Sequence, residues 1–259
     1  MAKRRNHQAS AQSRFAAIGK YLLLIVLAVV AVALVVLALN RPSVTPAEAG
    51  RTPAVTNTPD STPTPTPTAM PQTVAFLGDT YTAGDGVTAF DQRWTSRLSV
   101  ANGWTEVNAG VATTGYATAG ASDARPYTER VAEIVAAAPD IVIVSGGRFD
   151  YLGSSSAAAV SAGIVDTFTE LRAGLPEAQI IAIGPIWGDS APPARLAEIA
   201  SEVRVAVEAT GGSFLDVGQP LEGRPDVIAD DGVSPTDEGH ALLLEAIRTA
   251  IEPVVTARP

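Results

Sequence analysis

Short apolar runs alternate with longer mixed stretches from residue 73 onwards. The short runs are rich in β-branched residues, which predicts strands. The predicted strands are Thr73–Leu77, Thr105–Asn108, Asp140–Ser145, Gln179–Ile183 and Ser213–Val217. The stretches between them are long enough for helices. The predicted helices are Phe90–Ala101, Pro126–Ala138, Ser155–Ala173, Pro193–Thr210 and Thr236–Val254.

The order of these elements predicts the fold class. Strand and helix alternate, which is typical of a doubly wound α/β sandwich. Uninterrupted apolar runs, such as IVIV and IIAI, suit strands that are buried on both faces of a parallel sheet. We therefore expect a flavodoxin-like, five-stranded parallel sheet between two layers of helices. Ligand sites in such sheets form beyond the C-terminal ends of the strands.

The longest apolar run lies near the N-terminus, at residues 21–39, and contains no charged residue. A helix of this length crosses a bilayer core of about 30 Å. Cations precede the run and only Arg41 follows it closely, so the positive-inside rule places the N-terminus in the cytoplasm. We predict a retained, single-pass anchor in the cell membrane. The alternative is a cleaved signal peptide with a small-x-small site at Ala47–Ala49.

The next segment, residues 40–72, is rich in Thr and Pro and poor in large apolar side chains. Such a segment cannot bury enough surface to offset the entropy of ordering, so we expect a disordered stalk. The predicted organisation is a basic cytoplasmic tail (1–20), a transmembrane helix (21–39), the stalk (40–72) and an extracytoplasmic domain (73–259).

Composition excludes several kinds of chemistry. The 259-residue chain carries a net charge of −9, so we expect no nucleic-acid partner. It has no cysteine, which removes thiolate nucleophiles and cysteine-bound zinc. It has only two histidines, His7 and His240. We expect no cofactor.

Four loops carry a recognisable set of motifs. They read GDT after the first predicted strand, NAGVATTGY after the second, SGGRFDY after the third and DDGVSPTDEGH before the last helix. Together and in this order they resemble the blocks of the SGNH (GDSL-like) hydrolases, and the resemblance covers about residues 73–254. It implies an esterase fold and acyl transfer by a serine, a histidine and an aspartate.

The resemblance places substitutions at the catalytic positions. The nucleophile position is Thr80, the oxyanion asparagine position is Phe149, and the histidine position is Ser234. Two positions keep the family's residue: the orienting acid is Asp231, and the oxyanion glycine is Gly110. Asp79, Asp150 and His240 lie beside these positions as supporting residues.

Each substitution has a chemical cost. Thr80 keeps a hydroxyl but adds a methyl group that restricts the side chain. Ser234 has no group that is basic near neutral pH. Phe149 has no donor for an oxyanion, and we expect its ring to contact Thr80 and block that pocket.

Other residues near these loops have two possible interpretations. We expect His240 to be a structural or capping residue in the last helix, with a relocated general base as the alternative. The carboxylates Asp79, Asp85, Asp150 and Asp231 offer oxygen ligands for Mg²⁺ or Ca²⁺, but Asp is also an ordinary turn residue, and we expect no metal. A further set of aromatic residues either fills the former active site or lines a ligand cleft: Tyr81, Tyr116, Phe149, Tyr151 and Trp187.

Two functions remain open. The first is a catalytically inactive pseudoenzyme that binds a cell-wall glycan or an envelope protein. The second is an active esterase or deacetylase that acts on envelope glycans or lipids through Thr80 by a non-standard mechanism. The substitutions at Phe149 and Ser234 favour the first.

Overall fold

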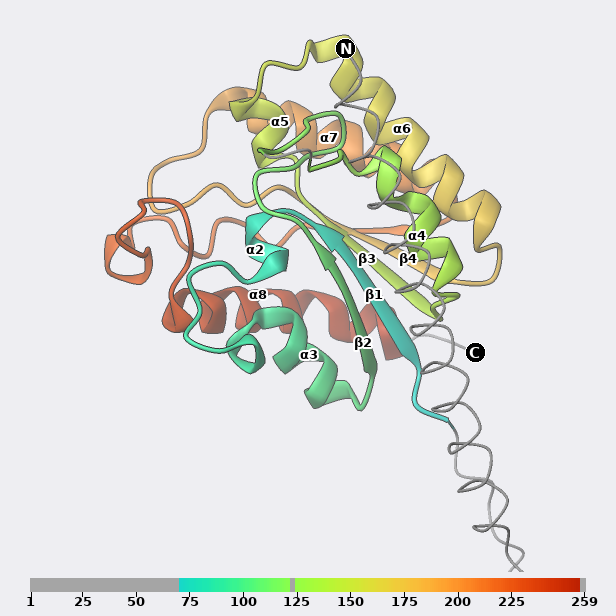
Figure 1. The fold of residues 1–259 in the computed structure, drawn as a ribbon, viewed down its shortest axis with the longest axis horizontal. Helices are drawn as coiled ribbons and strands as arrows, with labels where there is room; N and C mark the ends of the chain where they lie inside the picture. Colours follow the sequence, from blue (N-terminus) through green and yellow to red (C-terminus); the bar gives the residue numbers. More distant parts are fainter. Residues whose placement is uncertain (1–69, 122–123, 257–259) are drawn as a thin grey trace, which may run out of the picture. The chain divides into compact units, whose positions relative to one another are not determined.

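The computed structural model describes residues 70–121 and 124–256. A five-stranded parallel sheet runs through the centre of this part of the chain, in the order β2-β1-β3-β4-β5 (Figure 1). The strands are β1 (Thr73–Gly78), β2 (Thr105–Gly110), β3 (Ile141–Ser145), β4 (Gln179–Ile183) and β5 (Ser213–Leu215). The predicted α/β sheet is therefore confirmed.

Helices cover both faces of the sheet. On one face lie α3 (Trp94–Asn102) and α8 (Asp237–Thr256), and on the other lie α4 (Val131–Ala136), α6 (Ala157–Gly174) and α7 (Ala194–Ala209) (Figure 1). Two very short helices stand at the C-terminal ends of strands, namely α2 (Thr80–Ala83) after β1 and α5 (Arg148–Leu152) after β3. Single 3₁₀ turns occupy Phe90–Gln92, Thr128–Arg130 and Pro225–Val227.

Alternation along the strands builds one apolar core on each face of the sheet. In β1, Ala75 and Leu77 point to the α4, α6 and α7 side, whereas Val74 and Phe76 point to the α3 and α8 side. All four of these side chains are fully buried. Burial on both faces explains why the strand sequences are continuously apolar.

The structure refines the predicted helices. The helix predicted from Phe90 is interrupted at Arg93, whose backbone is extended, and α3 begins at Trp94. The helix predicted from Pro126 likewise begins as a 3₁₀ turn and is helical only from Val131. Neither α2 nor α5 was predicted from the sequence.

No helix within residues 70–121 or 124–256 is long and apolar enough to cross a bilayer. The predicted membrane span at 21–39 and most of the predicted stalk lie outside the described residues.

Candidate functional site

The C-terminal ends of β1, β2 and β3 lie side by side. In the sheet register, Gly78 at the end of β1 pairs with Gly110 of β2 on one side and with Ser145 of β3 on the other. The strand order reverses direction at β1, and such a switch point is where doubly wound sheets bind ligands. The loops that leave these strands carry most of the residues predicted for the site.

Thr80 is the first residue of α2, directly after the helix-capping residue Asp79. Its Oγ1 accepts a hydrogen bond of 3.0 Å from the backbone N–H of Thr113, which lies in the loop after β2. Only 2% of Thr80 is exposed to solvent. A backbone N–H therefore bonds to the hydroxyl at the predicted nucleophile position, and the residue is almost sealed from solvent.

The backbone donor at Thr80 is not the predicted one. The N–H of Gly110 donates to Asn108 Oδ1 at 2.8 Å, so it is already occupied. A Cβ atom at Gly110 would lie 2.2 Å from the backbone nitrogen of Ala83, which indicates that this glycine lets α2 pack against β2. The oxyanion role of Gly110 stays a prediction, and in this structure its N–H is engaged by Asn108.

Thr113 adopts an unusual backbone conformation. Its φ is +61°, in the left-handed region that β-branched residues rarely occupy. Strain of this kind persists only where the surrounding structure enforces it, and it often marks functional sites. Here it accompanies the N–H contact with Thr80.

Asp231 and Ser234 bond to each other. The Ser234 hydroxyl donates to Asp231 Oδ2 at 2.6 Å, and the N–H groups of Ser234 and Val233 both donate to Asp231 Oδ1 at 2.8 Å. These bonds, led by the one from the hydroxyl, lower the pKa of Asp231. The carboxylate is present as predicted, but its oxygens are engaged by its own loop.

His240 lies in the first turn of α8 and is fully buried. Its Nδ1 accepts the backbone N–H of Trp94 at 3.3 Å, which caps the start of α3. Burial lowers the pKa of His240 to about 4, against opposing effects from Asp85 and Asp237, so the imidazole is neutral near pH 7. This is the capping role that the sequence favours.

Two buried carboxylates shape the loops. Asp79 accepts the N–H of Tyr81 at 3.0 Å, and burial raises the pKa of Asp79 to about 7. Asp150 in α5 accepts the N–H groups of Tyr116, Ala117 and Thr118 at 2.8 to 3.2 Å. Asp150 thereby ties the loop after β2 to α5.

Arg148 is a site residue that the sequence analysis missed. Only 8% of it is exposed, and its guanidinium lies among the rings of Tyr81, Phe149 and Trp187. Its charge opposes the rise that burial causes in the pKa of Asp79, and it adds to the lowering of the pKa of Asp231 that the bonds from Ser234 cause. The signal in the sequence was a cation inside the GGRFD motif.

The aromatic residues predicted near the site lie in different environments. Tyr116 is fully buried and packs on Tyr127 and Phe168, so it belongs to the core. Phe149 is 8% exposed, and its predicted block of an oxyanion pocket beside Thr80 stays a prediction. Tyr151, which is 39% exposed, meets Trp187 edge-on with the ring centres 5.3 Å apart.

The predicted carboxylates do not form a metal cluster. Across residues 70–121 and 124–256, no three His, Asp or Glu side chains gather closely enough to hold a metal ion.

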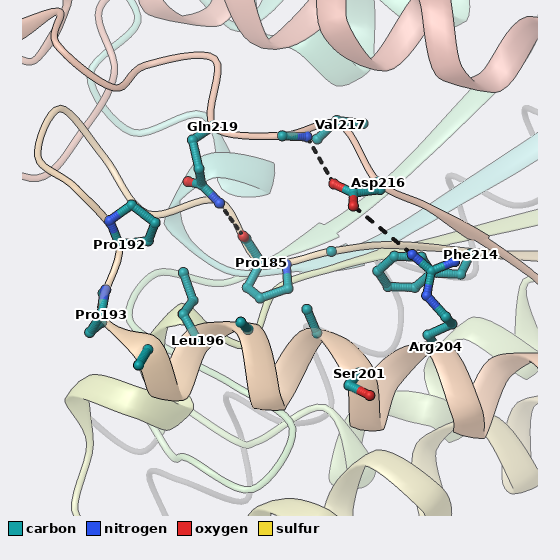
Figure 2. A pocket seen from close by; sticks show the side chains of 15 residues that line it. Pro185, Pro192, Pro193, Leu196, Ser201, Arg204, Phe214, Asp216, Val217 and Gln219 are labelled. Atoms are coloured by element: carbon teal, nitrogen blue, oxygen red, sulfur yellow. Dashed lines mark hydrogen bonds and ion pairs between the residues drawn. The ribbon is translucent and has the colours of Figure 1, made fainter.

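A cavity of about 480 Å³ lies beyond the ends of β4 and β5. Figure 2 shows α7 along one side of it and the segment from Asp216 to Gln219 along the other. Gln219 links the two segments that follow β4 and β5: its Nε2 donates to Pro185 O at 3.1 Å, and its Oε1 accepts the N–H of Trp187 at 2.7 Å. None of the residues predicted for catalysis lines this cavity.

Comparison with known proteins shows which family and which proteins this chain is similar to. Residues 76–242 match the model of the GDSL-like Lipase/Acylhydrolase family. A curated relative, the GDSL lipase Rv0518 of Mycobacterium tuberculosis, is 28% identical over 187 residues, which span 69% of this chain and 80% of the relative.

Solved structures share the fold at lower identity. The psychrotrophic esterase EstA from Pseudoalteromonas sp. superposes with a TM-score of 0.58 at 16% identity, over 71% of this chain and 99% of that one. A family two carbohydrate esterase from Clostridium thermocellum, solved with cellohexaose, also gives 0.58, at 15% identity, over 73% and 66%.

Proposed function

Because the chain belongs to the GDSL-like lipase/acylhydrolase family, we propose that its domain is a binding protein built on that fold. The domain holds a ligand at the C-terminal ends of β1 and β3 and does not hydrolyse esters by the serine–histidine route. The ligand is a cell-wall glycan or an envelope protein.

The bond between Ser234 and Asp231 carries this proposal. A hydrolase of this kind needs an imidazole that takes the proton of the nucleophile and is held by the carboxylate. Here a serine hydroxyl occupies that carboxylate at 2.6 Å. The imidazole of His240 is sealed and bonded to the start of α3, so it does not replace the missing base.

The burial of Thr80 supports the same interpretation. An ester carbonyl must reach the nucleophile at about 3 Å before acyl transfer begins. Thr80 and Ser234 each expose only 2% of their surface, so neither hydroxyl is open to a substrate in this conformation.

Ester hydrolysis by the full chain tests the proposal. We expect the native protein and a Thr80→Ala variant to release p-nitrophenol from p-nitrophenyl acetate at the same rate, equal to the rate in buffer with an equal amount of denatured protein. Turnover by the native protein that Thr80→Ala abolishes would refute the proposal.

The second candidate is an active esterase or deacetylase for envelope glycans or lipids that uses Thr80 by a non-standard mechanism. The contact between Thr80 Oγ1 and the Thr113 N–H favours it, because this N–H lies beside the hydroxyl and becomes free to stabilise an oxyanion once the oxygen bonds to a substrate carbonyl. If the native protein is active, a His240→Asn variant distinguishes the base: activity lost in that variant assigns proton transfer to the imidazole.

For the location, we propose a single-pass membrane protein with its domain outside the cytoplasm. The uncharged run at residues 21–39, with its cations on the N-terminal side, supports this proposal. Protease added to intact cells should remove the domain and leave a small membrane fragment. Complete protection of the domain, or its release into the medium by signal cleavage, would contradict the anchor.

A further inference from the structure

Arg148 is a buried cation that has no hydrogen-bond or ion-pair partner among the described residues. Its Nε and Nη1 atoms are shielded from solvent and make no hydrogen bond, and no ion pair involves its guanidinium. Burying an unsatisfied donor costs about 1 to 3 kcal/mol, and the cost is larger for a charged group. A folded protein that keeps such a group without a partner usually has a use for it.

The surroundings fix the guanidinium in place but do not satisfy its donors. Its Cζ lies 5.0 Å from the ring centre of Tyr81, 5.3 Å from that of Phe149 and 5.6 Å from that of Trp187. Rings at these distances stabilise a cation electrostatically. The N–H groups of arginine also require oxygen acceptors, which these rings do not provide.

The cage of rings is itself held firmly. The Tyr81 hydroxyl donates to the backbone oxygen of Trp187 at 3.0 Å, and the Trp94 indole N–H donates to the backbone oxygen of Tyr81 at 2.9 Å. These bonds link the loops that follow β1 and β4 around Arg148. The guanidinium is therefore preorganised at the edge of the sheet where ligands bind.

Two acids that feel the charge of Arg148, Asp79 and Asp231, bond to other groups. Asp79 uses its Oδ1 to accept the N–H of Tyr81, and Asp231 accepts bonds from Ser234 and Val233 on both oxygens. Both carboxylates feel the charge of Arg148, but neither bonds to it. The acceptor that would complete Arg148 is thus missing from the described chain.

We propose that Arg148 recognises an anionic group, a carboxylate or a phosphate, on the ligand of this domain. Such groups match the planar fork of a guanidinium and bind it with paired hydrogen bonds. The exposed ring of Tyr151, edge-on to Trp187, forms an aromatic rim against which the body of the ligand packs. The inference rests on the proposed binding function and adds the chemical class of the ligand.

Binding of small anionic probes to the full chain tests this inference. The probes are glucuronate for the carboxylate and inorganic phosphate for the phosphate, with glucose as the neutral control, and Kd is measured by calorimetry at fixed ionic strength. We expect at least one anion to bind and glucose to bind at least about tenfold more weakly. Which of the two anions binds tells the carboxylate source from the phosphate source.

Variants then assign the binding to Arg148. Arg148→Met should weaken anion binding at least about tenfold, while Arg248→Met, which removes the same charge from an exposed ion pair on α8, should leave it unchanged. Arg148→Lys keeps the charge without the fork, so it should bind more weakly than the native protein and provides a second variant if Arg148→Met does not fold.

Thermal unfolding separates a binding role from a structural one. Because the free protein leaves the Arg148 donors unsatisfied, Arg148→Met should unfold at the same temperature as the native protein or higher. The anion should raise the Tm of the native protein only. Absence of binding by both anions, or equal binding in Arg148→Met, would overturn this inference. Neither result bears on the proposed lack of ester turnover, which the p-nitrophenyl acetate assay decides separately.

Discussion

Asp79 and His240 are both buried, and their titrations change the stability of the fold in opposite directions. The pKa of Asp79 is raised from 3.8 to about 7, so the folded state keeps a proton that the unfolded state loses. Its stabilising contribution is therefore lost as the pH rises from about 4 to 7. The pKa of His240 is lowered from 6.5 to about 4, so its contribution is lost as the pH falls through that window. Between about pH 4 and 6.5 the two effects offset each other.

Substitution of Asp79 should reveal one of these effects. An Asp79→Asn side chain keeps an oxygen that accepts the Tyr81 N–H but does not ionise. At pH 8 we expect the variant to be more stable than the native protein by up to about 4 kcal/mol, and the difference should largely vanish at pH 4. Urea unfolding at both pH values measures it. The exposed carboxylate of Asp166 on α6 provides the control Asp166→Asn. A gain that is the same at both pH values would contradict the raised pKa.

Substitution of His240 should reveal the other effect. The side-chain oxygen of a His240→Asn variant can accept the Trp94 N–H in place of Nδ1, but it does not titrate. We expect a loss of stability at every pH, because the smaller side chain leaves a cavity. We also expect the variant to lack the acid-dependent loss of about 3 kcal/mol between pH 6.5 and 4. The free energy of unfolding, measured at several pH values across this range, gives the slope of stability against pH for each protein. A slope equal to that of the native protein would show that His240 is not the titrating group.

At the scale of residues, the sequence indicates where the residues of the candidate site lie better than it indicates what they do. Thr80, Asp231 and Ser234 could be located from motifs, because short patterns preserve their place at strand ends. The donor to Thr80, the N–H of Thr113, could not be located from the sequence. Thr113 has a φ of +61°, a conformation that glycine usually adopts, so nothing in the sequence indicates that a threonine adopts it here. Arg148 was missed for a related reason: the rings of Tyr81 and Trp187, which follow β1 and β4, reach it only in the folded chain.

At the scale of elements, α2 is held against the sheet by a close approach to Gly110. A Cβ atom there would lie 2.2 Å from Ala83 N and 2.5 Å from Thr82 C, both of which are backbone atoms. We expect Gly110→Ala to displace α2 and to cost about 2 kcal/mol or more, since overpacking against backbone has little room to relax. The control is Gly188→Ala, whose Cβ would meet only Tyr81 Oη, at 3.7 Å. Equal stability of the two variants in urea would disprove the close packing of α2.

The sheet and its main helices were predictable, whereas the two short helices were not. Apolar runs fixed all five strands because burial on both faces demands them, and β4 was predicted with the bounds that the structure has. The helices α2 and α5 have only four and five residues, too few to show a helical period. Their stability comes from tertiary contacts, such as the three N–H groups bound by Asp150, which no local pattern indicates.

At the scale of the whole domain, the family frame is intact around a changed site. The parallel sheet brings Thr80 and the loop after β2 to one edge, and the loop before α8 packs against Gly86, just beyond α2. Under the proposed function, Thr80 and Ser234 stand at the positions of the nucleophile and the base, and the guanidinium of Arg148 lies over the ring of Tyr81, next to Thr80 in the chain. If the domain is inactive, as we propose, a frame of this kind predicts that side-chain changes alone can restore hydrolysis.

The restoring changes are Thr80→Ser, Phe149→Asn and Ser234→His, made together in the full chain. They supply a nucleophile, an oxyanion donor and a base that Asp231 can orient once its bond with the Ser234 hydroxyl is gone. We expect weak hydrolysis of p-nitrophenyl acetate by the triple variant and none above background by any single variant, because a nucleophile without its base gains little. The activity should stay far below that of a natural esterase, since a misplacement of about 1 Å costs on the order of a hundredfold.

A matched control decides whether such activity comes from the restored residues. Adding Asp231→Asn to the triple variant removes the carboxylate that orients the new imidazole, and in a serine protease the equivalent change lowers turnover by about 10⁴-fold. We therefore expect the quadruple variant to return to background. Turnover that survives Asp231→Asn would mean that the hydrolysis does not pass through the restored pair. Absence of turnover in a folded triple variant would mean that the sealed backbone around Thr80, rather than the missing side chains, prevents catalysis.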